Sequence, residues 1–173
     1  VESISINEWQ DLFASSALKS AGFVINFIDE QMHGIKMGMQ SLNMVVDAWL
    51  DQWDIKERIS ILLDRGFEVI ITADHGNQEA IGTGIIKEGI KAETRGERVR
   101  LYTDETLRDS STQSYKGSVI AWPGPALGLP QATYPLLAGS DCAFKSKGET
   151  IVGHGGISLH EVVVPFIIIN RKQ

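Results

Sequence analysis

The stretch Val69-Ile70-Ile71-Thr72-Ala73-Asp74-His75-Gly76-Asn77 decides the fold, because an apolar run passes directly into a polar turn. The run from Phe67 to Ala73 is rich in β-branched residues and lies between two glycines, which predicts a buried strand. A strand buried on both faces is typical of a parallel sheet covered by helices. Ligands of such sheets bind at the carboxyl ends of the strands, where Asp74 and His75 offer a divalent metal a carboxylate and an imidazole.

The composition bounds the class of protein. The 173 residues include 43% hydrophobic ones and carry a formal net charge of −6, which predicts one domain, residues 1–173, with its own core. An acidic segment does not neutralise a phosphate backbone, so direct nucleic-acid binding by this segment is not expected. The single Cys142 excludes an internal disulfide, and the first residues show no signal peptide, so we expect a cytoplasmic protein. The longest apolar stretch, Val162 to Ile169, is too short to cross a bilayer, and no membrane partner is expected.

The rest of the chain alternates helical periodicity with short apolar runs. We predict helices over Asn7–Ala21 and, with a break at Asp54, over Met39–Arg65, and a buried strand over Phe23–Ile28. This order predicts an α/β fold with a largely parallel sheet and helices on both faces. Beyond it we predict a glycine-rich excursion from Glu79 to Arg100, then strands over Glu97–Tyr102, Ser118–Trp122, Tyr134–Gly139, Asp141–Phe144 and Val162–Ile169, and a helix over Thr103–Ser111 capped by Thr103 or Asp104.

Three of the four histidines share one sequence context. His33, His75 and His154 each lie in a glycine-flanked turn after an apolar run, with Asp29 before His33 and Asp74 before His75. One such residue alone would as readily satisfy nearby backbone groups. Three together with two aspartates favour a metal site, because carboxylates and imidazoles are the usual ligands. His160 lacks this context, and we predict a surface or structural role for it.

A cluster of basic residues lies within the glycine-rich excursion, and acidic residues interleave with it at Glu88, Glu93 and Glu97. This pattern favours a solvated, self-paired surface, and binding of an anionic substrate is the alternative. The basic residues are Lys87, Lys91, Arg95, Arg98 and Arg100.

Thr72 to Asn77 resembles the metal-binding motif of the alkaline phosphatase superfamily. Within that superfamily the chain most resembles the PglZ domain of bacterial phage-resistance systems (BREX, phage growth limitation). The resemblance covers Phe23 to Phe166 and implies an alkaline-phosphatase-like fold. It is carried by Asn26-Phe27-Ile28-Asp29 with His33, by Thr72 to Asn77, by Arg95 to Arg100, and by His154-Gly155-Gly156-Ile157-Ser158-Leu159 with Val162 to Pro165.

The resemblance implies two divalent ions, Zn²⁺ or Mn²⁺, in the complete domain. Asp29, His33 and His154 would hold one ion, and Asp74 and His75 would help to hold the other. Ions roughly 4 Å apart would clamp a phosphoryl group for an in-line displacement. The implied activity is hydrolysis of phosphate mono- or diesters in a phage-defence protein. The implied partners are a phosphorylated substrate and the other proteins of a defence complex.

One part of the family pattern is missing. In the superfamily a Ser or Thr nucleophile and a further Asp ligand come well before the first ligand pair, whereas Ser15 and Ser16 fall inside a predicted helix. We therefore expect the catalytic nucleophile upstream of this chain, and the chain to be the C-terminal part of the domain, with one metal or none and no activity alone. The alternatives are a non-catalytic interaction module of a defence complex and a phosphate-moving mutase.

Overall fold

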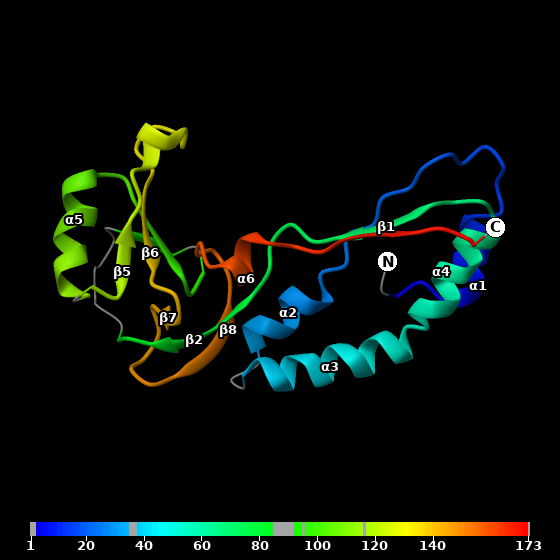
Figure 1. Ribbon diagram of the computed structural model, residues 1–173, viewed down its shortest axis with the longest axis horizontal. Coiled ribbons are helices and arrows are strands. Elements are labelled where there is room, and N and C mark those ends of the chain that lie inside the picture. The colour runs from blue at the N-terminus through cyan, green and yellow to red at the C-terminus, as the bar shows by residue number, and fades with distance from the viewer. Residues whose placement is uncertain (1–2, 35–37, 85–91, 95, 116, 173) are drawn as a thin grey trace. The chain divides into compact units, whose positions relative to one another are not determined.

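The computed structural model describes residues 3–34, 38–84, 92–94, 96–115 and 117–172 (Figure 1). The chain divides into two compact units, which are described separately. The first comprises Val1–Gly34, Gln40–Ala73 and Pro165–Gln173, and the second Ile35–Met39 and Asp74–Val164. Helices and strands are both present, so the predicted α/β class is confirmed in this broad form. No helix among the described residues is long and apolar enough to cross a membrane.

Four helices build most of the first unit: α1 (Ile6–Leu12), α2 (Phe27–Gly34), α3 (Met39–Gln52) and α4 (Ile55–Asp64). The predicted break at Asp54 is confirmed, because Asp54 has a φ of 52° and separates α3 from α4. Helix α1 is shorter than the predicted Asn7–Ala21. The Ser15 hydroxyl accepts a hydrogen bond from the Ala17 amide at 3.3 Å, and serines that bond nearby backbone in this way compete with the helix.

Aromatic side chains hold the first unit together. The Trp9 ring lies 5.0 Å from the Phe13 ring and 4.9 Å from the Phe23 ring. The guanidinium of Arg58 lies over the rings of Trp9 and Trp53. These contacts explain why the predicted strand over Phe23–Ile28 is wrong. Phe23 packs its ring into the aromatic cluster, residues 23–26 form no regular element, and Phe27 and Ile28 begin α2.

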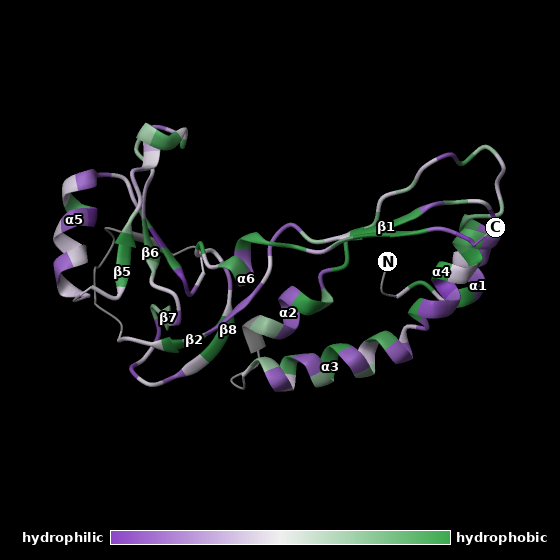
Figure 2. Cartoon of the chain, in the orientation of Figure 1, coloured by the Kyte–Doolittle hydropathy of each residue, from purple (hydrophilic) through white to green (hydrophobic). Residues whose placement is uncertain are grey.

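The opening apolar run forms β1 (Val69–Thr72), which pairs antiparallel with β9 (Phe166–Ile169). The strand is therefore confirmed, but its predicted burial on both faces is not. Ile70 is 52% exposed and its cross-strand partner Ile168 is 53% exposed, because β1 and β9 form a sheet of only two strands. Figure 2 shows β1 and the strand beside it in the colour of hydrophobic residues.

The second unit contains two small sheets. Strands β2 (Gln78–Gly82), β7 (Cys142–Ala143) and β8 (Thr150–Gly153) form one of them. The other has the order β3 (Ala92–Thr94), β4 (Val99–Tyr102), β6 (Tyr134–Ala138), β5 (Val119–Ala121).

The expected largely parallel sheet is not found, since β2 and β7 are the one parallel pair among the described strands. Helix α5 (Glu105–Ser114) does connect β4 to β5 as a crossover would. However, β6 lies between these two strands and runs antiparallel to both.

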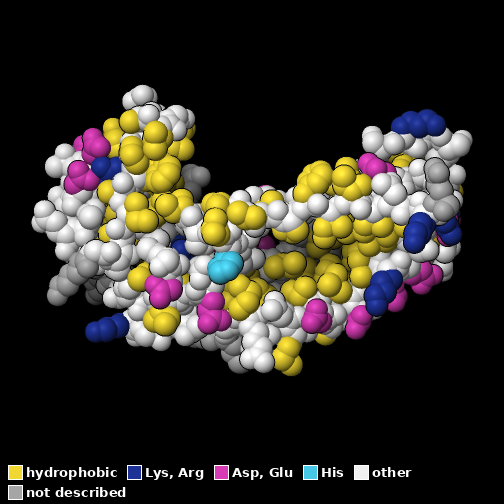
Figure 3. All heavy atoms as spheres, in the orientation of Figure 1, with side chains coloured by type: hydrophobic (Ala, Val, Ile, Leu, Met, Phe, Trp, Pro, Cys, Tyr) yellow, Lys and Arg dark blue, Asp and Glu magenta, His cyan; other side chains and the backbone are white. Residues whose placement is uncertain are grey.

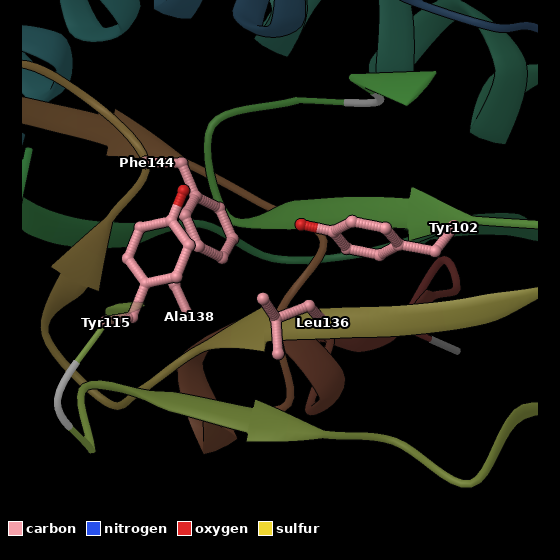
Figure 4. Packing of buried hydrophobic residues seen from close by; sticks show 5 residues of the cluster. All are labelled: Tyr102, Tyr115, Leu136, Ala138 and Phe144. Atoms are coloured by element: carbon pink, nitrogen blue, oxygen red, sulfur yellow. The ribbon is translucent and has the colours of Figure 1, made fainter. Parts of the chain in front are cut away.

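The larger buried cluster of the second unit lies on this four-stranded sheet, against which α5 packs. Figure 4 shows its five buried residues. The cluster contains Tyr102 of β4, Leu136 and Ala138 of β6, Tyr115 and Phe144. The rings of Tyr115 and Phe144 meet edge to face with their centroids 5.0 Å apart. Asp104 caps α5 as predicted, because its carboxylate accepts a hydrogen bond from the Leu107 amide at 3.1 Å.

Candidate metal centre

The register of β2 and β8 brings two of the predicted ligands together within the second unit. The strands are antiparallel, and Gln78 at the start of β2 pairs with Gly153 at the end of β8. Residues that precede Gln78 therefore lie beside residues that follow Gly153. His75 comes three residues before Gln78 and His154 directly after Gly153, so a pairing of distant segments places the two imidazoles at one edge of the sheet.

The imidazole rings of His75 and His154 are stacked, with their centroids 4.0 Å apart and their planes at 14°. Asp74 adds a carboxylate, since its Oδ2 lies 3.8 Å from Nε2 of His75. The Asp74 side chain is 90% exposed and the His75 side chain 34% exposed, so both are accessible from solvent. Two imidazoles and one carboxylate are donors that suit Zn²⁺ or Mn²⁺, so this part of the predicted ligand set fits a divalent ion.

The turn that carries His75 packs closely against α6 (Leu159–Val162). The Gly76 amide donates to the main-chain carbonyl of Glu161 at 2.8 Å. A Cβ at Gly76 would overlap the carbonyl oxygen of His160, so this contact requires glycine. The His160 ring lies 2.9 Å from Oε1 of Gln78, which is consistent with the structural role predicted for it.

Arg98 and Glu161 form a buried ion pair beside this turn. Arg98 is 0% exposed and Glu161 2% exposed, and two hydrogen bonds of 2.6 and 3.0 Å join them. Burial raises the pKa of the Glu161 carboxyl, but the bonds from Arg98 and from the amides of Ser158 and Gly156 outweigh it, and the pKa lies below its ordinary value. The predicted solvated role is therefore wrong for Arg98, because this pair removes it from water.

The prediction of a solvated surface has a different outcome for the remaining basic residues. Arg100 is half-buried with its guanidinium over the Phe144 ring. Lys87, Lys91 and Arg95 lie outside the described residues.

Glu161 is not among the site residues predicted from the sequence. Its signal was the Ser-x-x-Glu spacing from Ser158 to Glu161, which marks a helix start at which the glutamate turns back to the preceding backbone. The structure shows this arrangement, because the Ser158 amide donates to Oε2 of Glu161 at 3.1 Å.

The other two predicted ligands belong to the first unit. Asp29 and His33 lie on α2, about one helical turn apart, and the Asp29 side chain is exposed. The turn predicted for His33 is therefore wrong, since α2 continues through Gly34. The side chain of His33 lies outside the described part of the chain.

Comparison with known proteins supports one assignment. The family model of the BREX system PglZ alkaline phosphatase-like domain matches residues 10–169 of this 173-residue chain. This span includes all five predicted ligands and both members of the buried ion pair. A comparison with curated proteins gave no significant match.

Proposed function

Because the chain belongs to the PglZ family of BREX alkaline phosphatase-like domains, we propose that it is the metal-binding part of a phosphohydrolase acting in phage defence. The reaction would be hydrolysis of a phosphate mono- or diester. The observation that carries the proposal is the stack of His75 on His154, which the β2–β8 register holds at the edge of a sheet. Metal coordination would explain why two imidazoles stack beside a carboxylate, because two protonated rings at this distance would repel each other.

The proposal assigns ligands by residue. Asp29, His33 and His154 would hold one divalent ion and Asp74 and His75 would help to hold a second, with Zn²⁺ or Mn²⁺ as the metal. A bound divalent ion supplies a Lewis acid for the phosphoryl oxygens and lowers the pKa of the attacking group. The chain itself supplies imidazole nitrogens and carboxylate oxygens, and the hydrogen bond from the Gly76 amide to the Glu161 carbonyl holds the turn that carries His75. The Ser or Thr nucleophile is proposed to come from another segment of the complete protein.

A second candidate function has an observation of its own. One face of β1 and β9 presents Ile70, Phe166 and Ile168, each more than half exposed, and Figure 3 shows hydrophobic side chains gathered over these strands. Exposed apolar patches of this kind mark contacts with other proteins. The domain would then act as a non-catalytic interaction module of a defence complex, with its partners on this surface.

Metal binding by the purified chain tests the proposal first. We expect calorimetric titration with Zn²⁺ and Mn²⁺ to show roughly one ion per chain, because the proposed set of Asp29, His33 and His154 offers three donors to one ion. Replacement His154→Ala should abolish this binding. His160→Ala is the matched control and should bind as wild type does, since its ring contacts Gln78 and is not assigned to the metal.

Activity of the complete protein separates the two functions. Under the phosphohydrolase proposal, Asp74→Ala and His154→Ala in the full-length protein abolish hydrolysis of a chromogenic phosphate mono- or diester. If these variants hydrolyse the esters at the wild-type rate, the proposal is wrong. Unchanged partner binding and phage defence without Asp29 and His154 would support the interaction module instead.

A further inference from the structure

We propose that Arg98 and Glu161 are positioning residues that hold His75 and His154 against each other, and thereby set the metal affinity of this site. The inference rests on the proposed function for the role of the metal. Its geometric part stands on contacts within the second unit alone. Neither residue is assigned as a ligand, and both are almost completely buried.

The carboxylate of Glu161 fastens the loop that carries His154. Besides two bonds from Arg98, it accepts the Gly156 amide at 2.8 Å and the Ser158 amide at 3.1 Å. Gly156 and Ser158 follow His154 by two and four residues. A Cβ at Gly156 would lie 2.5 Å from Oε2 of Glu161 and 2.8 Å from Nη2 of Arg98, so the loop passes directly over the ion pair.

The main chain of Glu161 is hydrogen-bonded to the turn that carries His75. The Glu161 carbonyl accepts the Gly76 amide at 2.8 Å, and Gly76 is packed against the His160 carbonyl. Glu161 therefore contacts both histidine-bearing segments, one through its side chain and one through its backbone. A shift of this residue would move the two imidazoles relative to each other.

Arg98 anchors Glu161 to the four-stranded sheet and its connections. Its guanidinium donates to the carbonyls of Gly139 and Cys142, and its own carbonyl accepts the Ala138 amide at 2.8 Å. A buried ion pair is a weak source of net stability, because desolvation offsets much of the attraction. A pair that also binds two loops has a second effect, which is to fix geometry. Residues that orient metal ligands from outside the ligand set commonly change affinity by about 10–100-fold.

The test compares Glu161→Gln and Arg98→Lys with the control Arg108→Lys. Arg108 is another buried arginine of the same unit, but it binds the Trp122 carbonyl, Glu105 and Asp109. Zn²⁺ and Mn²⁺ affinity of the purified chain is measured by calorimetry, and folding by circular dichroism. We expect Glu161→Gln and Arg98→Lys to lower the affinity about tenfold or more, and Arg108→Lys to leave it within about twofold of wild type.

A second readout uses the metal-free chain. The stacked rings of His75 and His154 shift each other's proton resonances, and NMR of the imidazole protons reports this contact. Glu161→Gln and Arg98→Lys should lose the mutual shift while core resonances such as those of Leu136 stay in place. If Glu161→Gln fails to fold, Arg98→Lys decides, because it keeps the positive charge beside the carboxylate.

The outcomes separate this inference from the proposed function. Wild-type metal affinity and ring shifts in both folded variants would overturn the positioning role. So would an equal loss of affinity in Arg108→Lys. A wild-type chain and full-length protein that bind no metal would overturn the proposed function, and the ring shifts would still decide whether Arg98 and Glu161 hold the two histidines together.

Discussion

At the scale of single residues, Glu161 makes structural contacts that its sequence context indicates only weakly. It is a carboxylate at 2% exposure, where an unpaired charge would be strongly unfavourable. Arg98 and two backbone amides satisfy its oxygens, and its pKa is lowered in spite of burial. The ionised form is therefore the one that the folded protein stabilises.

This shift predicts how stability depends on pH. A group whose pKa is lower in the folded state stabilises the fold above its unfolded pKa, here the ordinary 4.5, and the contribution disappears as pH falls through the folded pKa. Glu161→Gln should lower the free energy of unfolding by about 3 kcal/mol near pH 7, because it leaves Arg98 without its partner charge. Below the folded pKa the difference from wild type should shrink.

Urea denaturation of wild type and Glu161→Gln, from pH 7 down to below the folded pKa of Glu161, measures the difference in their free energies of unfolding. Glu68→Gln, at an exposed position of the first unit, is the control and should show no such trend. A difference between Glu161→Gln and wild type that is the same at both ends of the pH range would contradict the assignment.

At the scale of elements, the ends of helices explain which local predictions succeeded. Asp54 separates α3 from α4 in a left-handed conformation and its side chain makes no capping hydrogen bond. Asp104 has ordinary extended geometry and caps α5 through its carboxylate. The same residue type thus strains one helix start and stabilises another, because the backbone conformation differs.

We predict opposite effects on stability for substitution of Asp54 and of Asp104. Asp54→Gly should raise the stability by about 0.5 kcal/mol, since glycine adopts a positive φ without steric cost and no capping bond is lost. Asp104→Ala should lower it by about 1 kcal/mol, because the Leu107 amide loses its acceptor. Thermal denaturation of both variants checks the signs. Destabilisation by Asp54→Gly would mean that the Asp54 side chain has a stabilising contact.

At the scale of the whole molecule, the main discrepancy concerns burial. The apolar run from Phe67 to Ala73 and the alternation of helices and strands predict a buried strand in a largely parallel sheet, yet β1 and β9 form a two-stranded ribbon with isoleucines exposed on it. Strands with apolar residues on both faces are stable in water only when other elements cover them. The ribbon therefore leaves an apolar surface exposed on the described part of the first unit.

Removal of this apolar surface is testable on the purified chain. The double variant Ile70→Thr/Ile168→Thr changes one cross-strand pair of the ribbon while keeping β-branched side chains. It should reduce binding of the dye ANS and slow self-association, because both residues are about half exposed. Ile120→Thr on β5, at 41% exposure, is the control and should have a smaller effect. Equal dye binding by wild type and the double variant would show that the ribbon is not the apolar surface in solution.

The sequence by itself determined the features that depend on neighbouring residues. These features are the helical spacing of α3 and α4 with their break at Asp54, the cap of α5, the strand β1, and the turn at Asp74 and His75. The family was also predictable, from the motifs that the chain shares with it. Capping bonds, turn geometry and hydrophobic periodicity act over a few residues, so the sequence shows them directly.

Only the tertiary structure decided which distant segments meet. His75 faces His154 because Gln78 pairs with Gly153, and Arg98 reaches a glutamate 63 residues away. The same non-local packing made Phe23 join an aromatic cluster instead of a strand, and buried an arginine that its charged neighbours placed on the surface. Burial and strand pairing depend on the packing of the whole unit, so no window of the sequence contains them.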